Sequence, residues 1–315
     1  MRKEAAAMVT AAQITHMMEG GMVADALGVP VEFSRRGTYH VTGMQGHGTY
    51  DQPAGSWSDD SSLTLCLMEN VNESGDFANL FDKMAAYTRG RYTPRGVMFD
   101  IGHTTHNAIA RFLAGTPPLD CGDTAPDTNG NGALMRIAPL ALVLLTEDDA
   151  AERRQVISDT TRLTHAHVRS IIGSVLFVEL LRALLRGETL ADALGPVFQQ
   201  VANSGFPAHE IAYYRRLAAP AFGQTPPAAI RSSGYVVDTL EAAIWVNLRS
   251  RSFQETALTA VNLGDDTDTV AQIAAMLYGA GHPEMTIPQE WSGQLMRTTL
   301  DRQIIAHFAK RYAEP

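Results

Sequence analysis

Two clusters of oxygen-bearing side chains, far apart in the sequence, are the groups in this chain most able to do chemistry. The first lies in GSWSDDSSLTL (55–65), where Ser58, Asp59 and Asp60 come directly before an apolar run. The second lies in NLGDDTDTVAQIAAMLYGA (262–280) and contains Asp265, Asp266, Thr267, Asp268 and Thr269. Both clusters stand where a hydrophobic helix should begin, so their side chains could simply accept backbone N–H groups and cap those helices.

A shared metal site is the second interpretation of the two clusters. If the two helices begin side by side, their carboxylates converge and repel one another strongly in a partly dry site. Hard divalent cations such as Mg²⁺, Mn²⁺ and Ca²⁺ prefer carboxylate and hydroxyl oxygens, and would relieve this repulsion. Two ions at the roughly 3.5–4 Å separation of paired sites would fit the number of ligands. The spacing alone leaves capping and metal binding both open.

Two further segments add weight to a ligand site. DTNGNGALMRIAPLAL (127–142) places small residues ahead of a predicted helix, where backbone N–H groups would be open to a phosphate, although a simple turn explains them as well. DIGHTTHNAI (100–109) offers Asp100 and Gly102 before another helix. Its histidines, with those in THAH (164–167), have no accompanying cysteines and fit no usual zinc spacing, so we do not expect a zinc site.

The elements that must position these groups are predicted to be helices. Periodic apolar residues indicate helices near 5–28, 59–72, 77–89, 104–114, 132–146, 150–161, 166–186, 189–203, 208–219, 236–248, 253–262, 268–280 and 295–312. Residues 30–57 show no clear period and are predicted to form a loop. Strand signals are scarce, because β-branched residues are scattered rather than alternating. We therefore predict an all-α fold with residues 1–315 in a single compact domain, whose long loops gather around the site.

Composition excludes several classes of protein. The 315 residues are 45% hydrophobic and 19% charged, as in a globular protein, and the net charge of −9 without a basic patch argues against binding nucleic acid. The two cysteines, Cys66 and Cys121, indicate no disulfide framework. No segment reaches the roughly 20 apolar residues of a membrane helix, and the N-terminus lacks the apolar core of a signal peptide. We expect a cytoplasmic protein.

Seven segments in order resemble the ADP-ribosylglycohydrolase family, especially its bacterial members of the dinitrogenase-reductase-activating type. They are GGMVADALGVPVEF, GSWSDDSSLTL, RGVMFDIGHTTHNAI, NGNGALMRIAPLAL, TRLTHAH, SSGYVVDTLEAAIW and NLGDDTDTVAQIAAMLYGA, spanning about residues 20–281. The pairing of Ser-Asp-Asp with Asp-x-Asp-Thr is the most specific part of the match. The resemblance implies an all-α fold with a cleft that holds two Mg²⁺ ions, with Mn²⁺ as an alternative.

The resemblance also implies roles for individual residues. The family's metal ligands fall on Ser58, Asp59, Asp60, Asp266, Asp268 and Thr269. The candidate catalytic residues are Asp100, Asp60 and Glu32, of which Glu32 falls near the metal entrance. The candidate substrate-binding residues are Gly102, Thr104, Gly130, Asn131, Gly132, Met135, His165 and Tyr235. One position departs from the common Gly-Gly-Asp pattern: Asp265 stands between Gly264 and Asp266, where it could support the ligands or narrow access to the ribose.

The implied activity is the hydrolysis of a glycosidic bond between ADP-ribose and a modified side chain, with arginine as the leading candidate. Serine-linked ADP-ribose, O-acetyl-ADP-ribose and nucleic-acid conjugates are alternative substrates. The rival class is a binding or immunity protein that neutralises an ADP-ribosyltransferase toxin by direct contact. The intact set of ligand positions favours an enzyme, which we expect to be a monomer acting on ADP-ribosylated proteins.

Overall fold

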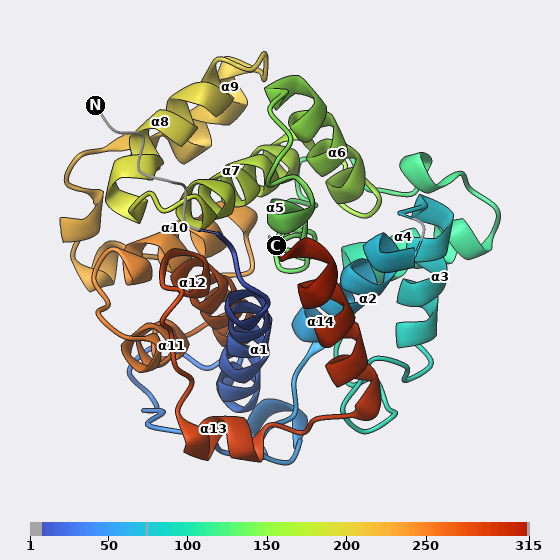
Figure 1. The fold of residues 1–315 in the computed structure, drawn as a ribbon, viewed down its shortest axis with the longest axis vertical. Helices are drawn as coiled ribbons and strands as arrows, with labels where there is room; N and C mark the ends of the chain where they lie inside the picture. The colour runs from blue at the N-terminus through green and yellow to red at the C-terminus, as the bar shows by residue number, and fades with distance from the viewer. Residues whose placement is uncertain (1–7, 74, 314–315) are drawn as a thin grey trace.

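The fold consists of helices packed around one buried helix, α12 (Figure 1). The computed structural model describes residues 8–73 and 75–313, and no β-strand forms within them. The α-helices of this part of the chain are α1 (Ala11–Gly28), α2 (Asp59–Glu73), α3 (Phe77–Tyr87), α4 (His103–Leu113), α5 (Leu140–Val143), α6 (Ala150–Arg162), α7 (Val168–Leu185), α8 (Leu190–Ala202), α9 (Ala208–Ile211), α10 (Val236–Asn247), α11 (Phe253–Val261), α12 (Thr267–Gly281), α13 (Gln289–Gln294) and α14 (Thr299–Tyr312). Short 3-10 turns, η1 to η6, lie between them.

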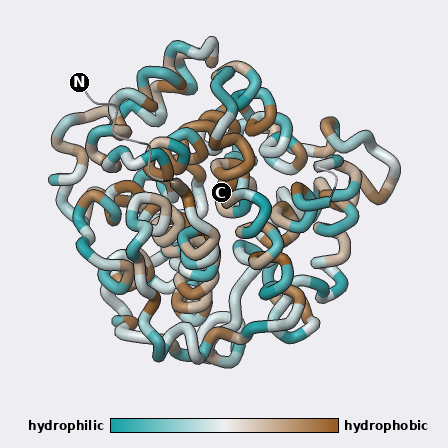
Figure 2. Tube along the Cα trace, viewed as in Figure 1, coloured by the Kyte–Doolittle hydropathy of each residue, from teal (hydrophilic) through white to brown (hydrophobic). Residues whose placement is uncertain are grey.

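Helix α12 is central because it is apolar on every side. All of its residues from Thr267 to Ala280 are buried, and it packs against α1, α7, α10 and α11. A helix that is hydrophobic all round belongs inside a protein. Its neighbour α7 is largely apolar as well, and it lies among the brown segments of Figure 2. The acidic N-terminus of α12 is therefore delivered into the interior together with the rest of the helix.

Helices α1 and α12 lie side by side because small residues allow their backbones to meet (Figure 1). A Cβ added to Gly279 of α12 would lie 3.0 Å from the Cα of Met17 in α1. A Cβ added to Gly28, at the end of α1, would lie only 2.4 Å from the Cα of Asp268. The Thr267 hydroxyl also donates to the Gly28 carbonyl at 2.8 Å. These contacts place the second acidic cluster directly against the end of α1.

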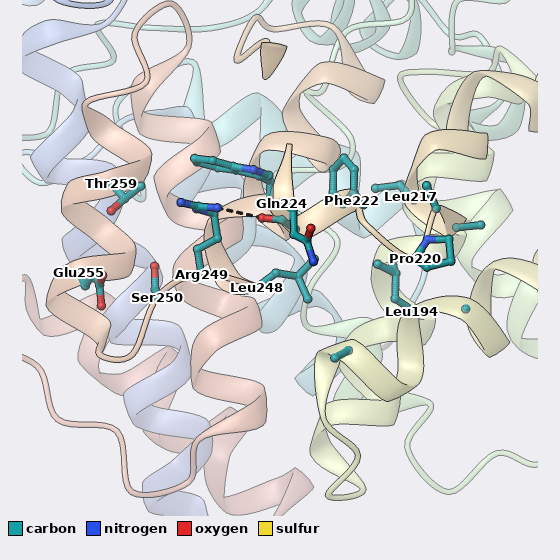
Figure 3. A pocket seen from close by; sticks show the side chains of 16 residues that line it. Leu194, Leu217, Pro220, Phe222, Gln224, Leu248, Arg249, Ser250, Glu255 and Thr259 are labelled. Atoms are coloured by element: carbon teal, nitrogen blue, oxygen red, sulfur yellow. Dashed lines mark hydrogen bonds between the residues drawn. The ribbon is translucent and has the colours of Figure 1, made fainter. Parts of the chain in front are cut away.

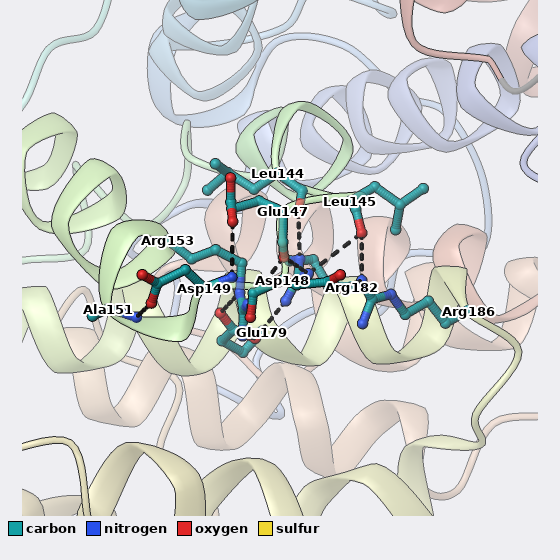
Figure 4. Close-up of polar contacts among 10 residues, drawn as sticks. All are labelled: Leu144, Leu145, Glu147, Asp148, Asp149, Ala151, Arg153, Glu179, Arg182 and Arg186. Atoms are coloured by element: carbon teal, nitrogen blue, oxygen red, sulfur yellow. Dashed lines mark hydrogen bonds and ion pairs between the residues drawn. The ribbon is translucent and has the colours of Figure 1, made fainter.

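A buried ion network holds α6, α7 and the segment after α5 together (Figure 4). Glu179 accepts from Arg153 at 2.7 Å and from Arg182 at 2.8 Å. Arg182 also donates to the backbone carbonyls of Leu144 and Glu147, each at 2.8 Å. Because both arginines and the glutamate are almost fully buried, the network fixes this part of the scaffold.

Most of the predicted helices are present, and the differences have local causes. The helix predicted over 132–146 is wrong: turns occupy 132–139, and only Leu140–Val143 is helical. Pro139 explains this, because it lacks an N–H and disfavours helical geometry at the residue before it. The segment 208–219 starts as α9 and continues as a 3-10 helix, and α13 was not predicted. Residues 5–7 of the first predicted helix lie outside the described residues. None of the described helices has the length and apolarity to cross a membrane.

Candidate active site

The N-terminus of α2 is capped by a side chain from α1. The Asp25 carboxylate accepts the Ser58 N–H at 3.0 Å and the Ser61 N–H at 3.1 Å, and the Ser61 hydroxyl donates to it as well. Capping by Asp25 leaves the carboxylates of Asp59 and Asp60 free for other contacts. Both are buried at the start of the helix.

The two predicted clusters meet at this point. The hydroxyls of Ser58 and Thr269 each donate to Oδ2 of Asp60, both at 3.3 Å, so that one oxygen of α2 contacts both clusters. Asp59 accepts the Gly102 N–H at 3.3 Å, which brings the start of α4 to the same place. The convergence that a shared site requires is therefore present, and helix capping alone does not account for it.

A third group of carboxylates lies beside this meeting point. Glu32, Asp100 and Asp268 each present a carboxylate oxygen within 4.8 Å of the others, an arrangement that could hold a cation. Glu32 follows the turn η1 (Val29–Val31), which continues directly from α1. The Tyr87 hydroxyl donates to the Asp100 carbonyl and so fixes the backbone at Asp100.

The carboxyl groups here are crowded and dry. Burial raises the pKa of Glu32 to about 9, and the neighbouring Asp100 and Asp266 carboxylates add to the rise. Burial likewise raises the pKa values of Asp59, Asp60, Asp100, Asp266 and Asp268 above their usual range. Three buried oxygens in the group have no hydrogen-bond partner among the described residues: Glu32 Oε2, Asp60 Oδ1 and Asp266 Oδ1. Unpartnered acceptors at such a density are what a cation site requires.

These groups line a cavity of about 400 Å³, within the usual range for small-molecule sites. Most predicted site residues lie in its wall: Glu32, Asp59, Asp60, Asp100, Gly102, Thr104, Gly130, Asn131, Gly132, Met135, His165, Asp266 and Thr269. Ser58 and Asp268 do not line the cavity but are buried behind it. No lysine or arginine is among the described residues that line it.

Tight packing shapes the loop of Gly130, Asn131 and Gly132 in the cavity wall. A Cβ added to Gly132 would lie 3.0 Å from Cε1 of His165, so a side chain at this position would close the cavity wall. Asn131 donates to Asp266 at 2.8 Å and thereby holds one oxygen of that carboxylate. His165 is buried, and burial lowers its pKa to about 3, so the imidazole is neutral. It can bind a ligand by hydrogen bonding but carries no charge.

Two predicted positions lie apart from the cavity. The Tyr235 hydroxyl accepts from Arg169 at 3.2 Å, and the residue lines a neighbouring hollow rather than this cavity. Asp265 is exposed, with a left-handed φ of 61°, and does not line the cavity.

A larger hollow, of about 840 Å³, lies elsewhere, between α8, α10 and α11 (Figure 3). Its walls combine apolar residues such as Leu194, Phe222 and Leu248 with polar ones. Arg249 lies at its edge, with its guanidinium stacked on Trp245 and donating to the Gly223 carbonyl at 3.0 Å. None of the predicted site residues lies in this hollow, so size alone does not mark the site.

Sequence reasoning missed several residues of the site, among them Phe33, Asp25 and Tyr50. Asp25 caps α2, and in the sequence it was one of two acids, with Glu19, in the Ala- and Met-rich first helix. Tyr50 lies in the segment predicted as a loop, and its hydroxyl lowers the pKa of Glu32 and of Asp100 against the larger effect of burial. Aperiodic segments give no signal for such long-range contacts.

Comparisons with known proteins identify the family of this chain. The family model for ADP-ribosylglycohydrolase matches residues 8–315. The protein named ADP-ribosylarginine hydrolase Tri1 from Serratia proteamaculans (strain 568) is 32% identical over 282 residues, which are 88% of this chain and 74% of that protein. Its namesake from Pseudomonas putida (strain GB-1) is 34% identical, over 86% of this chain and 71% of that protein.

More distant comparisons point the same way. The ADP-ribosyl-[dinitrogen reductase] glycohydrolase of Rhodospirillum rubrum is 28% identical, over 88% of this chain and 87% of that protein. A solved structure described as an ADP-ribosylglycohydrolase-related protein complex superimposes with a TM-score of 0.79 at 29% identity, covering 96% of this chain and 99% of that one. The chain therefore belongs to the ADP-ribosylglycohydrolase family and is a hydrolase that removes ADP-ribose by cleaving a glycosidic bond.

Proposed function

We propose that this protein cleaves the bond between ADP-ribose and the guanidinium of a modified arginine, with two Mg²⁺ ions, or Mn²⁺, held by the convergent carboxylates. The observation that carries the proposal is the charge of the cavity. It is lined by Glu32, Asp59, Asp60, Asp100 and Asp266, with no lysine or arginine among its described lining residues. Two divalent ions would leave negative charge over, and a cationic leaving group suits such a site.

The residues fit a pair of cations. Glu32, Asp60 and Asp266 each have a buried oxygen that could bind a cation and has no hydrogen-bond partner in the described part of the chain. The ligand set would be Ser58, Asp59, Asp60, Asp266, Asp268 and Thr269. When bound, the ions would supply positive charge to hold the ribose hydroxyls and to lower the pKa of a water. Asp25 and Asn131 keep the ligand carboxylates in place through the hydrogen bonds described above.

The chain's own groups would carry the rest of the reaction. Asp100 would take a proton from the attacking water as the bond between the ribose C1 and the guanidinium nitrogen breaks, through an oxocarbenium-like transition state. The leaving nitrogen would regain its electron pair and take a proton from Glu32, whose carboxyl group lies within 4.8 Å of that of Asp100.

Helix and loop backbones would hold the diphosphate. The first-turn N–H groups of α4, beyond Gly102, have no acceptor within the helix and face the cavity through Thr104 and its neighbours. The loop of Gly130, Asn131 and Gly132 would receive the remainder of the nucleotide, beside the neutral imidazole of His165. The lack of lysine and arginine in the wall makes backbone donors the natural choice.

The test is a panel of defined conjugates linked through arginine, serine, an acetyl group or nucleic acid, assayed before and after chelation. We expect release of ADP-ribose from arginine, loss of activity with EDTA and recovery with Mg²⁺ or Mn²⁺. Metal should also raise the melting temperature, because it binds the folded state. Preference for another linkage would overturn the substrate, and full activity after chelation would overturn the metal centre.

A further inference from the structure

An aromatic rim, defined here as Phe33, Tyr50 and Phe99, stands at the mouth of the cavity on the side of Glu32 and Asp100. Phe33 and Tyr50 both line the cavity, and their ring centroids are 6.4 Å apart in an edge-on arrangement. Phe99 supports Tyr50, with a centroid distance of 5.2 Å. The rim is therefore a packed unit at the entrance to the carboxylate cluster.

Phe33 has a strained backbone conformation. Its side chain is 68% exposed, and its backbone has a φ of 62°, in the left-handed region that bulky residues avoid. Two hydrogen bonds enforce this conformation: Phe33 N–H to the Asp265 carbonyl at 2.6 Å, and Asp265 N–H to the Ser34 carbonyl at 3.0 Å. Asp265 is left-handed as well. An isolated exposed Phe needs no explanation, but an exposed Phe in a strained backbone beside an active site does.

The segment that carries Tyr50 is also held in place by backbone contacts. Gly48, at the start of the turn that carries Tyr50, has a φ of 71°, and an added Cβ would lie 1.8 Å from the Pro30 carbonyl oxygen. The Thr49 hydroxyl donates to the Glu32 carbonyl at 2.6 Å. These contacts press the Tyr50 segment against the one that carries Glu32 and Phe33. The two rings are thus preorganised before any substrate arrives.

The chemistry around the rim selects a planar cation. Phe33 and Tyr50 offer aromatic surface, and the Tyr50 hydroxyl is near enough to the carboxyl groups of Glu32 and Asp100 to act on the pKa of each. A guanidinium is flat, stacks on aromatic rings and pairs with carboxylates. A primary ammonium lacks the flat face, and a neutral hydroxyl leaving group lacks the charge.

We propose that Phe33 and Tyr50 form the leaving-group subsite and receive the guanidinium of the modified arginine by stacking. This inference rests on the proposed function, because it supposes an arginine linkage. It assigns the specificity for that linkage to two residues of the segment between α1 and α2, outside the carboxylate cluster.

The experiment measures guanidinium binding apart from catalysis. Methylguanidine is titrated into the enzyme saturated with ADP-ribose, and methylammonium serves as a cation without a flat face. We expect Phe33→Ala to weaken methylguanidine binding about 5- to 30-fold, the equivalent of ~1–2 kcal/mol of lost cation–π interaction. Phe33→Trp should retain it, whereas Phe33→Leu, which keeps apolar area but no ring, should lose it. Affinity for ADP-ribose should stay constant throughout.

A matched control is Val97→Ala, which removes another exposed apolar side chain and should leave methylguanidine binding unchanged. If Phe33→Ala does not fold, Phe33→Asn gives a second ring-free variant, because Asn tolerates a left-handed backbone. Equal binding by the Leu variant, or equal binding of methylammonium, would overturn the proposal. So would a parallel loss of ADP-ribose affinity, which would assign the ring to the nucleotide. A wild-type enzyme that binds methylguanidine through Phe33 yet leaves ADP-ribosylarginine intact would contradict the proposed function instead.

Discussion

Asp25 of α1 and Ser61 of α2 are joined by two hydrogen bonds, from the Ser61 N–H at 3.1 Å and from its hydroxyl, both to Oδ2 of Asp25. A third bond, from the Ser58 N–H, completes the cap. Both carboxylate oxygens of Asp25 are therefore occupied, and α2 begins at a fixed angle to α1. The orientation of Asp59 and Asp60 depends on a residue that is not among those lining the carboxylate cavity.

Replacing Asp25 should weaken metal binding without unfolding the protein. In Asp25→Asn one acceptor becomes an NH₂ donor facing the donors of Ser58 and Ser61, so the start of α2 must shift. We expect the affinity for Mn²⁺, measured by calorimetry, to fall about 10- to 100-fold, as is usual when the partners of metal ligands are removed. Asp301→Asn is the matched control, because Asp301 is a buried cap of α14. It should lower stability and leave Mn²⁺ affinity intact; the same pattern in Asp25→Asn would reduce Asp25 to a structural cap.

Asp265 should be dispensable, and glycine should serve better at its position. Its side chain is exposed and its φ of 61° suits glycine, while its N–H and carbonyl make the contacts with Ser34 and Phe33. We expect Asp265→Gly to retain activity and to raise the free energy of unfolding by about 0.5–1 kcal/mol through relief of strain. Asp265→Ala keeps a Cβ and should be less stable than the glycine variant in urea denaturation. Loss of turnover in both variants would give the carboxylate a role in the reaction.

The sequence predicts the two acidic clusters but not their contact in space. The acids at the starts of α2 and α12 could be predicted as candidate site residues because each cluster is followed by apolar residues at helical spacing. The same spacing predicted the positions of the two helices. Their convergence depends on the close approach of Gly28 to Asp268, a contact between positions 240 residues apart in numbering that no local pattern encodes. The resemblance to a family supplied that relation, and the Thr269–Asp60 hydrogen bond gives it a physical basis.

The residues that escaped prediction share a cause. Asp25 reads as one polar position in a helix, and Tyr50 lies in a segment whose conformation is set by left-handed residues and by contacts with η1. The turn region 132–139 was predicted as helix because its apolar residues are spaced as in a helix, although Pro139 interrupts it. Propensity and period describe neighbours along the chain, whereas a site is made by neighbours in space.

The metal-free protein should lose stability as the pH rises from 6.5 to 8.5. The pKa of Glu32 is about 9 in the fold against an ordinary value of 4.5, so in this window the folded state holds a proton that the unfolded chain has released. Stability therefore falls with rising pH, by at most about 1.4 kcal/mol per pH unit for this one group. Urea denaturation after chelation measures the effect. Glu32→Gln should make the profile less steep, because one of several groups with a raised pKa is removed, and a flat profile in the unmodified protein would contradict the burial of this charge.

Asp100→Asn should separate binding from chemistry. The substitution is nearly isosteric, the backbone at this position stays tied to the Tyr87 hydroxyl, and the predicted metal ligands remain. An amide cannot accept the proton of the attacking water, so we expect the rate to fall by 10² to 10⁴, the usual contribution of a general base, while calorimetry still detects ADP-ribose. Tyr87→Phe is the companion variant, since it frees the Asp100 carbonyl but leaves the carboxylate. It should reduce the rate far less.

If Asp100→Asn turns over normally, the proton passes elsewhere, and Glu32, within 4.8 Å of Asp100 in the same group, becomes the residue to test. If ADP-ribose no longer binds, Asp100 holds the ribose rather than the proton. A variant that keeps binding and loses turnover would also decide against a protein that acts by contact alone, because such a protein has no turnover to lose.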